Sequence, residues 1–210
     1  MREFESLQGR CLLKTDFGRL IIVTKHDTIE IRWHGRGGQG AVTSAELIAR
    51  AAIETGGYAQ AFPAFGPERR GAPVLAFDRI SSGPIRSRAE VNNPDIVVVL
   101  DPRLMDAVNV TAGLKEGGLL AVNTRLDPGE LSARFDNMFR VATVDANTIA
   151  REVLGVPIVN TTMIGVLIKA SGILKPEELF EPLKDRFGRL AEKNINAMKR
   201  AFEETRIKEQ

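Results

Sequence analysis

The sequence predicts an α/β fold: a three-layer α/β/α sandwich around a mostly parallel but mixed sheet. Residues 28–57 pass from an alternating apolar pattern, through glycines, into a helical pattern. Residues 94–101, PDIVVVLD, form the continuous apolar run that is typical of a strand buried on both faces. Strand and helix patterns alternate from there toward the C-terminus, which favours helices on both faces of the sheet.

The remaining elements follow in chain order. Strands are expected at residues 28–34, 58–65, 74–80, 94–101, 118–124 and 139–146. The short links between residues 58 and 91 predict antiparallel pairing there. Helices are expected at residues 41–57, 102–118, 127–135, 146–155, 159–174 and 175–190, the 159–174 segment being apolar on most sides and therefore buried.

The C-terminal segment predicts an amphipathic helix, because Ile195, Met198 and Phe202 recur at helical spacing. Its apolar face would cover the domain's own sheet, which we favour, or a partner subunit. Residues 1–27 are expected to be an N-terminal extension in which LIIV (20–23) has the composition of a short strand. Residues 28–210 are expected to form one domain.

Composition excludes several function classes. The chain has 210 residues with 29 Lys and Arg against 27 Asp and Glu, so nothing indicates nucleic-acid binding. Cys11 is the single cysteine, which excludes a disulfide, a four-cysteine iron–sulfur cluster or a cysteine-rich zinc site within this chain. No dedicated metal site is expected with only His26 and His34 in addition. No apolar segment reaches membrane-span length, and we expect a cytoplasmic protein.

The loop HGRGGQG contains the pattern G-x-G-x-x-G at Gly35, Gly37 and Gly40. A strand that turns through glycines into a helix leaves backbone N–H groups free at the helix start, where they and the helix dipole favour an anion. The alternative is a tight strand–helix turn with no ligand.

NAD fits this loop less well than another phosphate ligand. A dinucleotide fold places an acidic residue at the end of the next strand to hold a ribose hydroxyl. That strand ends here without an acid, and the first one after it is Glu68, followed by Arg69 and Arg70. Arginines suit phosphate, because a guanidinium can donate two parallel hydrogen bonds. The two arginines could instead form a solvated pair or an intersubunit salt bridge.

Two further polar residues have open interpretations. His34 is either a partly buried residue bonded to backbone or a ligand contact, and we favour the former. Asn123 follows an expected strand, where it could be a turn former. Ligands in open α/β sheets collect at strand carboxyl ends, which raises the case for a binding role.

Several segments together closely resemble the gamma subunit of 2-oxoacid:ferredoxin oxidoreductases, especially the pyruvate and 2-oxoisovalerate members. They are IRWHGRGGQGAVTSAELIARAA, QAFPAFGPERRGAPVLAFDRI, PDIVVVLDPRL and GGLLAVNT. The combination of HGRGGQG with FGPERRGAP at this separation is specific, whereas the glycine pattern alone is not. The likeness runs from about Thr28 to the C-terminal helix.

The resemblance implies a companion subunit in a cytoplasmic complex with alpha, beta and delta subunits. Thiamine diphosphate, Mg and [4Fe-4S] clusters would be on those partners, and ferredoxin would accept the electrons. Coenzyme A would bind near this chain, with no catalytic residue here. The expected contacts are Gly35, Arg36, Gly37, Gly38, Gln39, Gly40, Arg69, Arg70 and Asn123.

Three alternatives stay open. The chain could serve a 2-oxoisovalerate or another 2-oxoacid enzyme instead of a pyruvate enzyme. It could be an independent NAD(P)-binding oxidoreductase. It could also be a non-catalytic assembly module in which the glycine loop is only a turn and PERRG seals a subunit contact.

Overall fold

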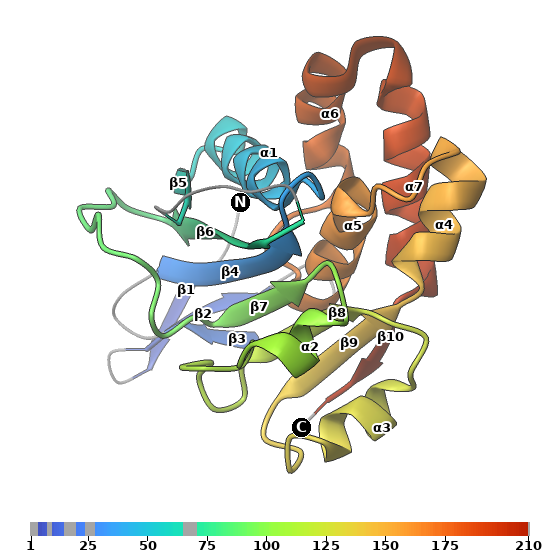
Figure 1. Cartoon of the computed structure of the whole chain (residues 1–210). Helices are drawn as coiled ribbons and strands as arrows, with labels where there is room; N and C mark the ends of the chain where they lie inside the picture. Colours follow the sequence, from blue (N-terminus) through green and yellow to red (C-terminus); the bar gives the residue numbers. More distant parts are fainter. Residues whose placement is uncertain (1–3, 8–9, 15–19, 24–27, 65–70, 210) are drawn as a thin grey trace.

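The computed structural model describes residues 4–7, 10–14, 20–23, 28–64 and 71–209 (Figure 1). A seven-stranded sheet has the order β10-β9-β8-β7-β4-β6-β5. Its four central strands are parallel: β4 (Thr28–Arg36), β7 (Ile96–Val99), β8 (Leu119–Asn123) and β9 (Arg140–Val144). The others pair antiparallel with their neighbours: β5 (Tyr58–Pro63), β6 (Pro73–Ser81) and β10 (Arg206–Lys208). The expected mixed, mostly parallel sheet is confirmed, including the antiparallel pairing between residues 58 and 91.

The two faces of the sheet carry unequal helical layers (Figure 1). One face is covered by α1 (Ala41–Glu54) and α5 (Asn160–Ser171), with α4 (Ala146–Leu154), α6 (Phe180–Phe187) and α7 (Ala191–Glu204) on the same side. Short 3-10 helices at Pro176–Leu179 and Gly188–Leu190 precede and follow α6. Of the helices that the structure describes, α2 (Leu104–Ala107) and α3 (Pro128–Ala133) lie on the other face.

Alternation along the central strands divides the core in two. In β7, Val98 packs in the cluster with α1 and α5, whereas Val97 and Val99 pack in the smaller cluster on the opposite face. Successive side chains of a strand point to opposite faces, so a strand covered on both faces must be apolar throughout. This is the physical reason for the uninterrupted apolar run in the sequence.

The expected helix over residues 102–118 is wrong, because only Leu104–Ala107 is helical. Val108 is extended, and turns follow it. The carbonyls of Val110 and Ala112 point instead at the guanidinium of Arg32 on β4, and accept hydrogen bonds of 3.0 and 2.6 Å. A helix would have used those carbonyls internally.

Helix α7 does not pack against the element that was expected, which was the sheet. Its buried residues Ala197, Met198 and Ala201 join the core cluster of this chain, but α7 packs mainly against α5 and α4 rather than on the sheet. Gly165 of α5 makes this close packing possible, because a Cβ there would lie 2.2 Å from the Met198 carbonyl oxygen.

The N-terminal residues contain a separate three-stranded antiparallel sheet of β1 (Phe4–Leu7), β2 (Arg10–Lys14) and β3 (Leu20–Val23). The strand expected at residues 20–23 is confirmed, and β1 and β2 were not expected. The division into an extension and a single domain from residue 28 stays a prediction.

Candidate functional site

The glycine loop joins the carboxyl end of β4 to the start of α1. Gly38 and Gly40 have φ values of +92° and +80°, which side chains rarely tolerate, so the turn depends on glycine at both positions. A second strand end is tied to the loop: Gly37 N donates to the Ala72 carbonyl (2.9 Å) and Gly71 N donates to the Gly37 carbonyl (3.2 Å). The loop is therefore held from both sides.

The N-terminus of α1 is open. Among the described residues no side chain caps it, and its first turn contains no acidic residue. Within the described residues, the N–H groups of Ala41, Val42 and Thr43 have no hydrogen-bond acceptor. Free N–H groups and the positive end of the helix dipole suit an anion.

A charged cluster borders the loop. Asp101, two residues after the end of β7, accepts hydrogen bonds from Arg36 Nε (2.9 Å) and from Arg103 Nε and Nη2 (3.1 and 3.0 Å). Burial opposes ionisation of Asp101, but the hydrogen bonds from Arg103 and Arg36 outweigh it and lower its pKa to about 2. Asp101 is thus a carboxylate with two arginine partners, and Arg103 stays mostly exposed.

Arg36 and Gln39, two of the expected ligand contacts, make hydrogen bonds that hold the loop together. Arg36 is engaged with Asp101, and its Nη1 also donates to the Gly71 carbonyl (3.2 Å). The Gln39 side chain folds back on the loop, because its Oε1 accepts from Arg36 N (2.8 Å). The glycines and these two side chains form one connected unit.

Asn123 ends β8 and is almost fully buried, at 1% exposure. Its Nδ2 donates to the Leu100 carbonyl (2.9 Å), and its Oδ1 has no hydrogen-bond partner among the described residues. By strand alternation it faces α5, like Leu119 and Ala121. Asn123 therefore joins the end of β8 to the residue after β7, on the face of the sheet that α5 covers.

Arg69 and Arg70 lie outside the described residues. Gly71, the next residue in the chain, bonds to the glycine loop as stated above. Their expected phosphate contacts stay a prediction.

His34 is a buried, neutral residue on the face opposite α1. Its Nε2 accepts a hydrogen bond from Arg32 Nε (3.0 Å), so its partner is a side chain rather than the expected backbone group. Burial, with a smaller contribution from the charge of Arg32, lowers the pKa of His34 to about 4. The sheet therefore separates the His34 imidazole from α1.

Sequence reasoning missed Asp101, Arg103 and Asn160. Asp101 had a signal, because it follows an apolar strand run at a position where ligands collect. Asn160 had none, because its place beside Gly40 comes from the packing of α5 against α1.

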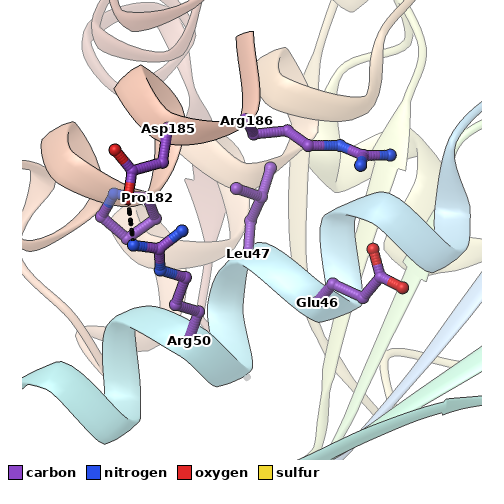
Figure 2. A pocket seen from close by; sticks show the side chains of 6 residues that line it. All are labelled: Glu46, Leu47, Arg50, Pro182, Asp185 and Arg186. Carbon is purple, nitrogen blue, oxygen red and sulfur yellow. Dashed lines mark hydrogen bonds and ion pairs between the residues drawn. The ribbon is translucent and has the colours of Figure 1, made fainter. Parts of the chain in front are cut away.

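A pocket of about 310 Å³ lies between α1 and α6 (Figure 2). Arg50 and Asp185 form an ion pair across it, and Glu46 and Arg186 flank it. It lies beside the middle of α1 and not at the open N-terminus. Its balanced charges select no class of ligand.

The described residues contain neither a candidate metal site nor a helix that could cross a membrane. No group of three or more His, Cys, Asp or Glu side chains is placed to hold a metal ion there. No helix within the same residues has both the length and the apolar character needed to cross a membrane.

Comparison with known proteins gives consistent matches. The family described as pyruvate ferredoxin/flavodoxin oxidoreductase matches residues 30–204. The chain is 54% identical to a pyruvate/ketoisovalerate oxidoreductases common subunit gamma from Thermococcus litoralis, over 86% of this chain and 99% of that one. It is 50% identical to a pyruvate synthase subunit PorC from Methanothermobacter thermautotrophicus, over 84% and 95%.

Solved structures agree. The crystal structure of a pyruvate oxidoreductase subunit from Thermotoga maritima superposes with a TM-score of 0.77 at 38% identity, over 87% of this chain and 99% of that one. These matches extend over nearly the whole length of the relatives. The chain belongs to the pyruvate ferredoxin/flavodoxin oxidoreductase family.

Proposed function

We propose that this chain is the gamma subunit of a cytoplasmic pyruvate:ferredoxin oxidoreductase and contributes to coenzyme A binding and to assembly. The complex would convert pyruvate and coenzyme A to acetyl coenzyme A and CO2, and would pass two electrons to ferredoxin. The observation that carries the proposal is the match to relatives named as gamma or PorC subunits over 95–99% of their length.

The sequence supports a companion role. One cysteine cannot hold a [4Fe-4S] cluster, so clusters would be on other subunits together with thiamine diphosphate and Mg. The proposed partners are alpha, beta and delta subunits, with ferredoxin as the acceptor of the whole complex. Within this chain, residues 28–210 would form the gamma domain.

Coenzyme A is the proposed ligand of the glycine loop. Its phosphates would meet the free N–H groups at the start of α1, and Arg69 and Arg70 would pair with phosphate oxygens. The open, uncapped helix start and the absence of acid from its first turn fit an anionic ligand. Arg36 and Gln39 would hold the glycine loop in place, and Asn123 would hold the neighbouring strand ends together.

An independent NAD(P) enzyme is less well supported. On one side of β4 the neighbour is the antiparallel β6, so no parallel strand brings an acid beside the loop there. On the other side β7 is followed by Asp101, but its oxygens already bind Arg36 and Arg103. A carboxylate held in this way is poorly placed to accept hydrogen bonds from ribose.

The second candidate is a gamma subunit for a 2-oxoisovalerate enzyme. The name of the Thermococcus litoralis relative joins both substrates in a common subunit, which favours service to two enzymes. The 2-oxoacid would contact other chains, so this chain fits either.

The first experiment purifies the native complex without oxygen through a tag on this chain. We expect coenzyme-A-dependent dye reduction, with pyruvate the best of a panel of 2-oxoacids. Equal activity with branched-chain acids would favour the shared subunit. A chain that purifies alone and without activity would overturn the proposal.

The second experiment tests the ligand in the intact complex. Replacing Arg69 and Arg70 with alanine should raise the KM for coenzyme A about 10-fold or more, because charge-assisted bonds to phosphate are lost. The matched control replaces Arg86 and Arg88, two exposed arginines that follow β6 at the opposite end of β4. An unchanged KM in the Arg69 and Arg70 variant would remove these arginines from the site.

A further inference from the structure

A buried acidic side chain lies between the sheet and α1. Asp78 of β6 has no exposed surface. By strand alternation it points to the same face as Ala76 and Ile80, which pack in the core cluster that contains α1. The acid interrupts an otherwise apolar layer, so its state of ionisation affects how α1 packs on the sheet.

Asp78 has one hydrogen-bond partner within the described part of the chain. Its Oδ2 accepts a hydrogen bond from Trp33 Nε1 on β4 (2.7 Å), whereas its Oδ1 is buried and unpaired. The indole N–H is a neutral donor and supplies no opposite charge. A single neutral donor does not offset the cost of burying a carboxylate.

No charged side chain of the described residues faces Asp78. Ile31 of β4 and Ala61 of β5 flank it in the sheet. The buried residues of α1 are all uncharged, and the charged side chains of α1 are exposed. Glu30 and Arg79 point to the opposite face and pair with each other (2.8 Å). Burial therefore raises the pKa of Asp78 well above the ordinary value of 3.8, and the bond from Trp33 only partly opposes the shift.

The contact between Asp78 and Trp33 lies behind the glycine loop. Trp33 is two residues before Gly35, the first glycine of the loop. β6 begins at Pro73, and the carbonyl of the preceding residue, Ala72, accepts a hydrogen bond from the loop. The contact thus joins the two strands that hold the loop, on the face that α1 covers. Separation of α1 from these strands would expose Asp78 to water.

We infer that Asp78 and Trp33 form a proton-dependent switch beneath α1. In the closed state Asp78 is a neutral carboxylic acid that accepts the hydrogen bond from Trp33. When α1 opens from the sheet, water reaches the carboxyl group, its O–H bond breaks and the proton passes to solvent. A rise in pH therefore favours the open state, in which the glycine loop loses its support from α1. This inference is independent of the proposed function and of which ligand the loop binds.

The pH dependence of the switch has a definite sign and slope. Above pH 3.8 the exposed Asp78 of the open state loses its proton, whereas the buried Asp78 of the closed state keeps it. The closed state therefore loses stability as pH rises toward the pKa of the buried carboxyl group. One proton leaves at each opening, so the opening equilibrium should rise about 10-fold per pH unit in this interval.

The experiment measures amide hydrogen exchange of α1 in the full chain across this interval, for the wild type and for Asp78→Asn. Asparagine keeps an acceptor for Trp33 and nearly the same shape, but it does not titrate. We expect the protection of the Ala45–Ala52 amides to fall with pH in the wild type. The ratio of the protection factor of the variant to that of the wild type should rise about 10-fold per pH unit.

Two results of this experiment would overturn the switch. The first is a ratio that does not change with pH, which would mean that opening releases no proton from Asp78. The second is equal protection of α1 and β7, because Asp78 would then reach water only when the whole chain unfolds.

The control is Asp106→Asn, the same change at an exposed residue of α2 on the other face of the sheet. Its protection factors should follow those of the wild type at every pH. A control ratio with the same slope as that of Asp78→Asn would assign the effect to net charge and overturn the switch. His34 is present in all three proteins, so its own titration cancels in the ratios.

If Asp78→Asn does not fold, the wild type decides the outcome. At one pH unit above 3.8 an ordinary aspartate is about 90% ionised. Carbon-13 NMR of the Asp78 carboxyl carbon should show the protonated form there, and the protection of α1 should fall as pH rises further. An ionised carboxyl group at that pH, or protection that does not change, would overturn the switch.

Discussion

His34 shows at the residue scale how burial sets acid sensitivity. The imidazole is 5% exposed and lies beside the Arg32 guanidinium, so protonation would place two positive charges together in the interior. The Nε2 lone pair is used by Arg32, which fixes the neutral tautomer with its proton on Nδ1. The pKa of about 4 in the folded chain lies below the ordinary histidine value of 6.5.

This shift predicts a loss of stability in acid. The stabilising contribution is present above pH 6.5 and is lost as pH falls toward 4, because only the unfolded chain takes up the proton in that interval. A shift of this size corresponds to about 3 kcal/mol in the free energy of unfolding. His34→Gln keeps an acceptor for Arg32 without titrating, and should flatten the pH dependence.

The measurement is denaturant unfolding of both proteins between about pH 7 and about pH 4. Burial raises the pKa of Asp78 well above its usual range, so Asp78 acts with the opposite sign and destabilises the fold as pH rises above the ordinary carboxyl value. Because both proteins contain Asp78, the difference between their curves isolates His34. Parallel curves would show that His34 does not control acid stability.

At the scale of elements, one glycine fixes how α5 and α7 pack. Alanine normally stabilises a helix interior by about 1 kcal/mol relative to glycine. At Gly165 the added Cβ would lie 2.2 Å from the Met198 carbonyl oxygen, so the two helices would have to separate. The cost of this steric clash exceeds the gain in helix propensity. Gly165→Ala should therefore lower the free energy of unfolding by about 1–3 kcal/mol.

Chemical unfolding of the Gly165→Ala variant measures this effect, with the Gly83→Ala variant as the control. A Cβ on Gly83 would meet no atom within 4 Å, so that substitution should change stability by less than about 0.5 kcal/mol. Equal stability of the two variants would mean that the helices accommodate the methyl group and that close approach is not required.

At the scale of the whole molecule, the sheet has a fully buried centre and more exposed edge strands. All of Ile96–Val99 and Leu119–Asn123 are buried, whereas the edge strand Tyr58–Pro63 is half-exposed and Arg206–Lys208 has only three residues. Amide hydrogen exchange should therefore be slowest in β7 and β8, where it requires global unfolding, and faster in β5 and β10. Exchange in β7 as fast as in β10 would contradict a single cooperative core.

The sequence by itself determined the layer architecture and the place of the glycine loop. The alternating pattern before Gly35, the apolar run PDIVVVLD and the apolar helix at residues 159–174 are local signals, and each became the expected element. A strand buried on both faces and a helix buried on all sides must be apolar, so the sequence pattern alone predicts their burial.

Only the tertiary structure decided which residues far apart in the chain are in contact. Segment 102–118 has helical composition, yet the Arg32 guanidinium on β4 donates hydrogen bonds to two of its carbonyls and only one turn of helix remains. Asp101 is separated from Arg36 by α1, β5, β6 and β7, and Asn160 is 120 residues from Gly40 in the chain, yet each pair is in contact. Such contacts depend on strand order and helix packing, which no local pattern encodes, and they define the candidate site.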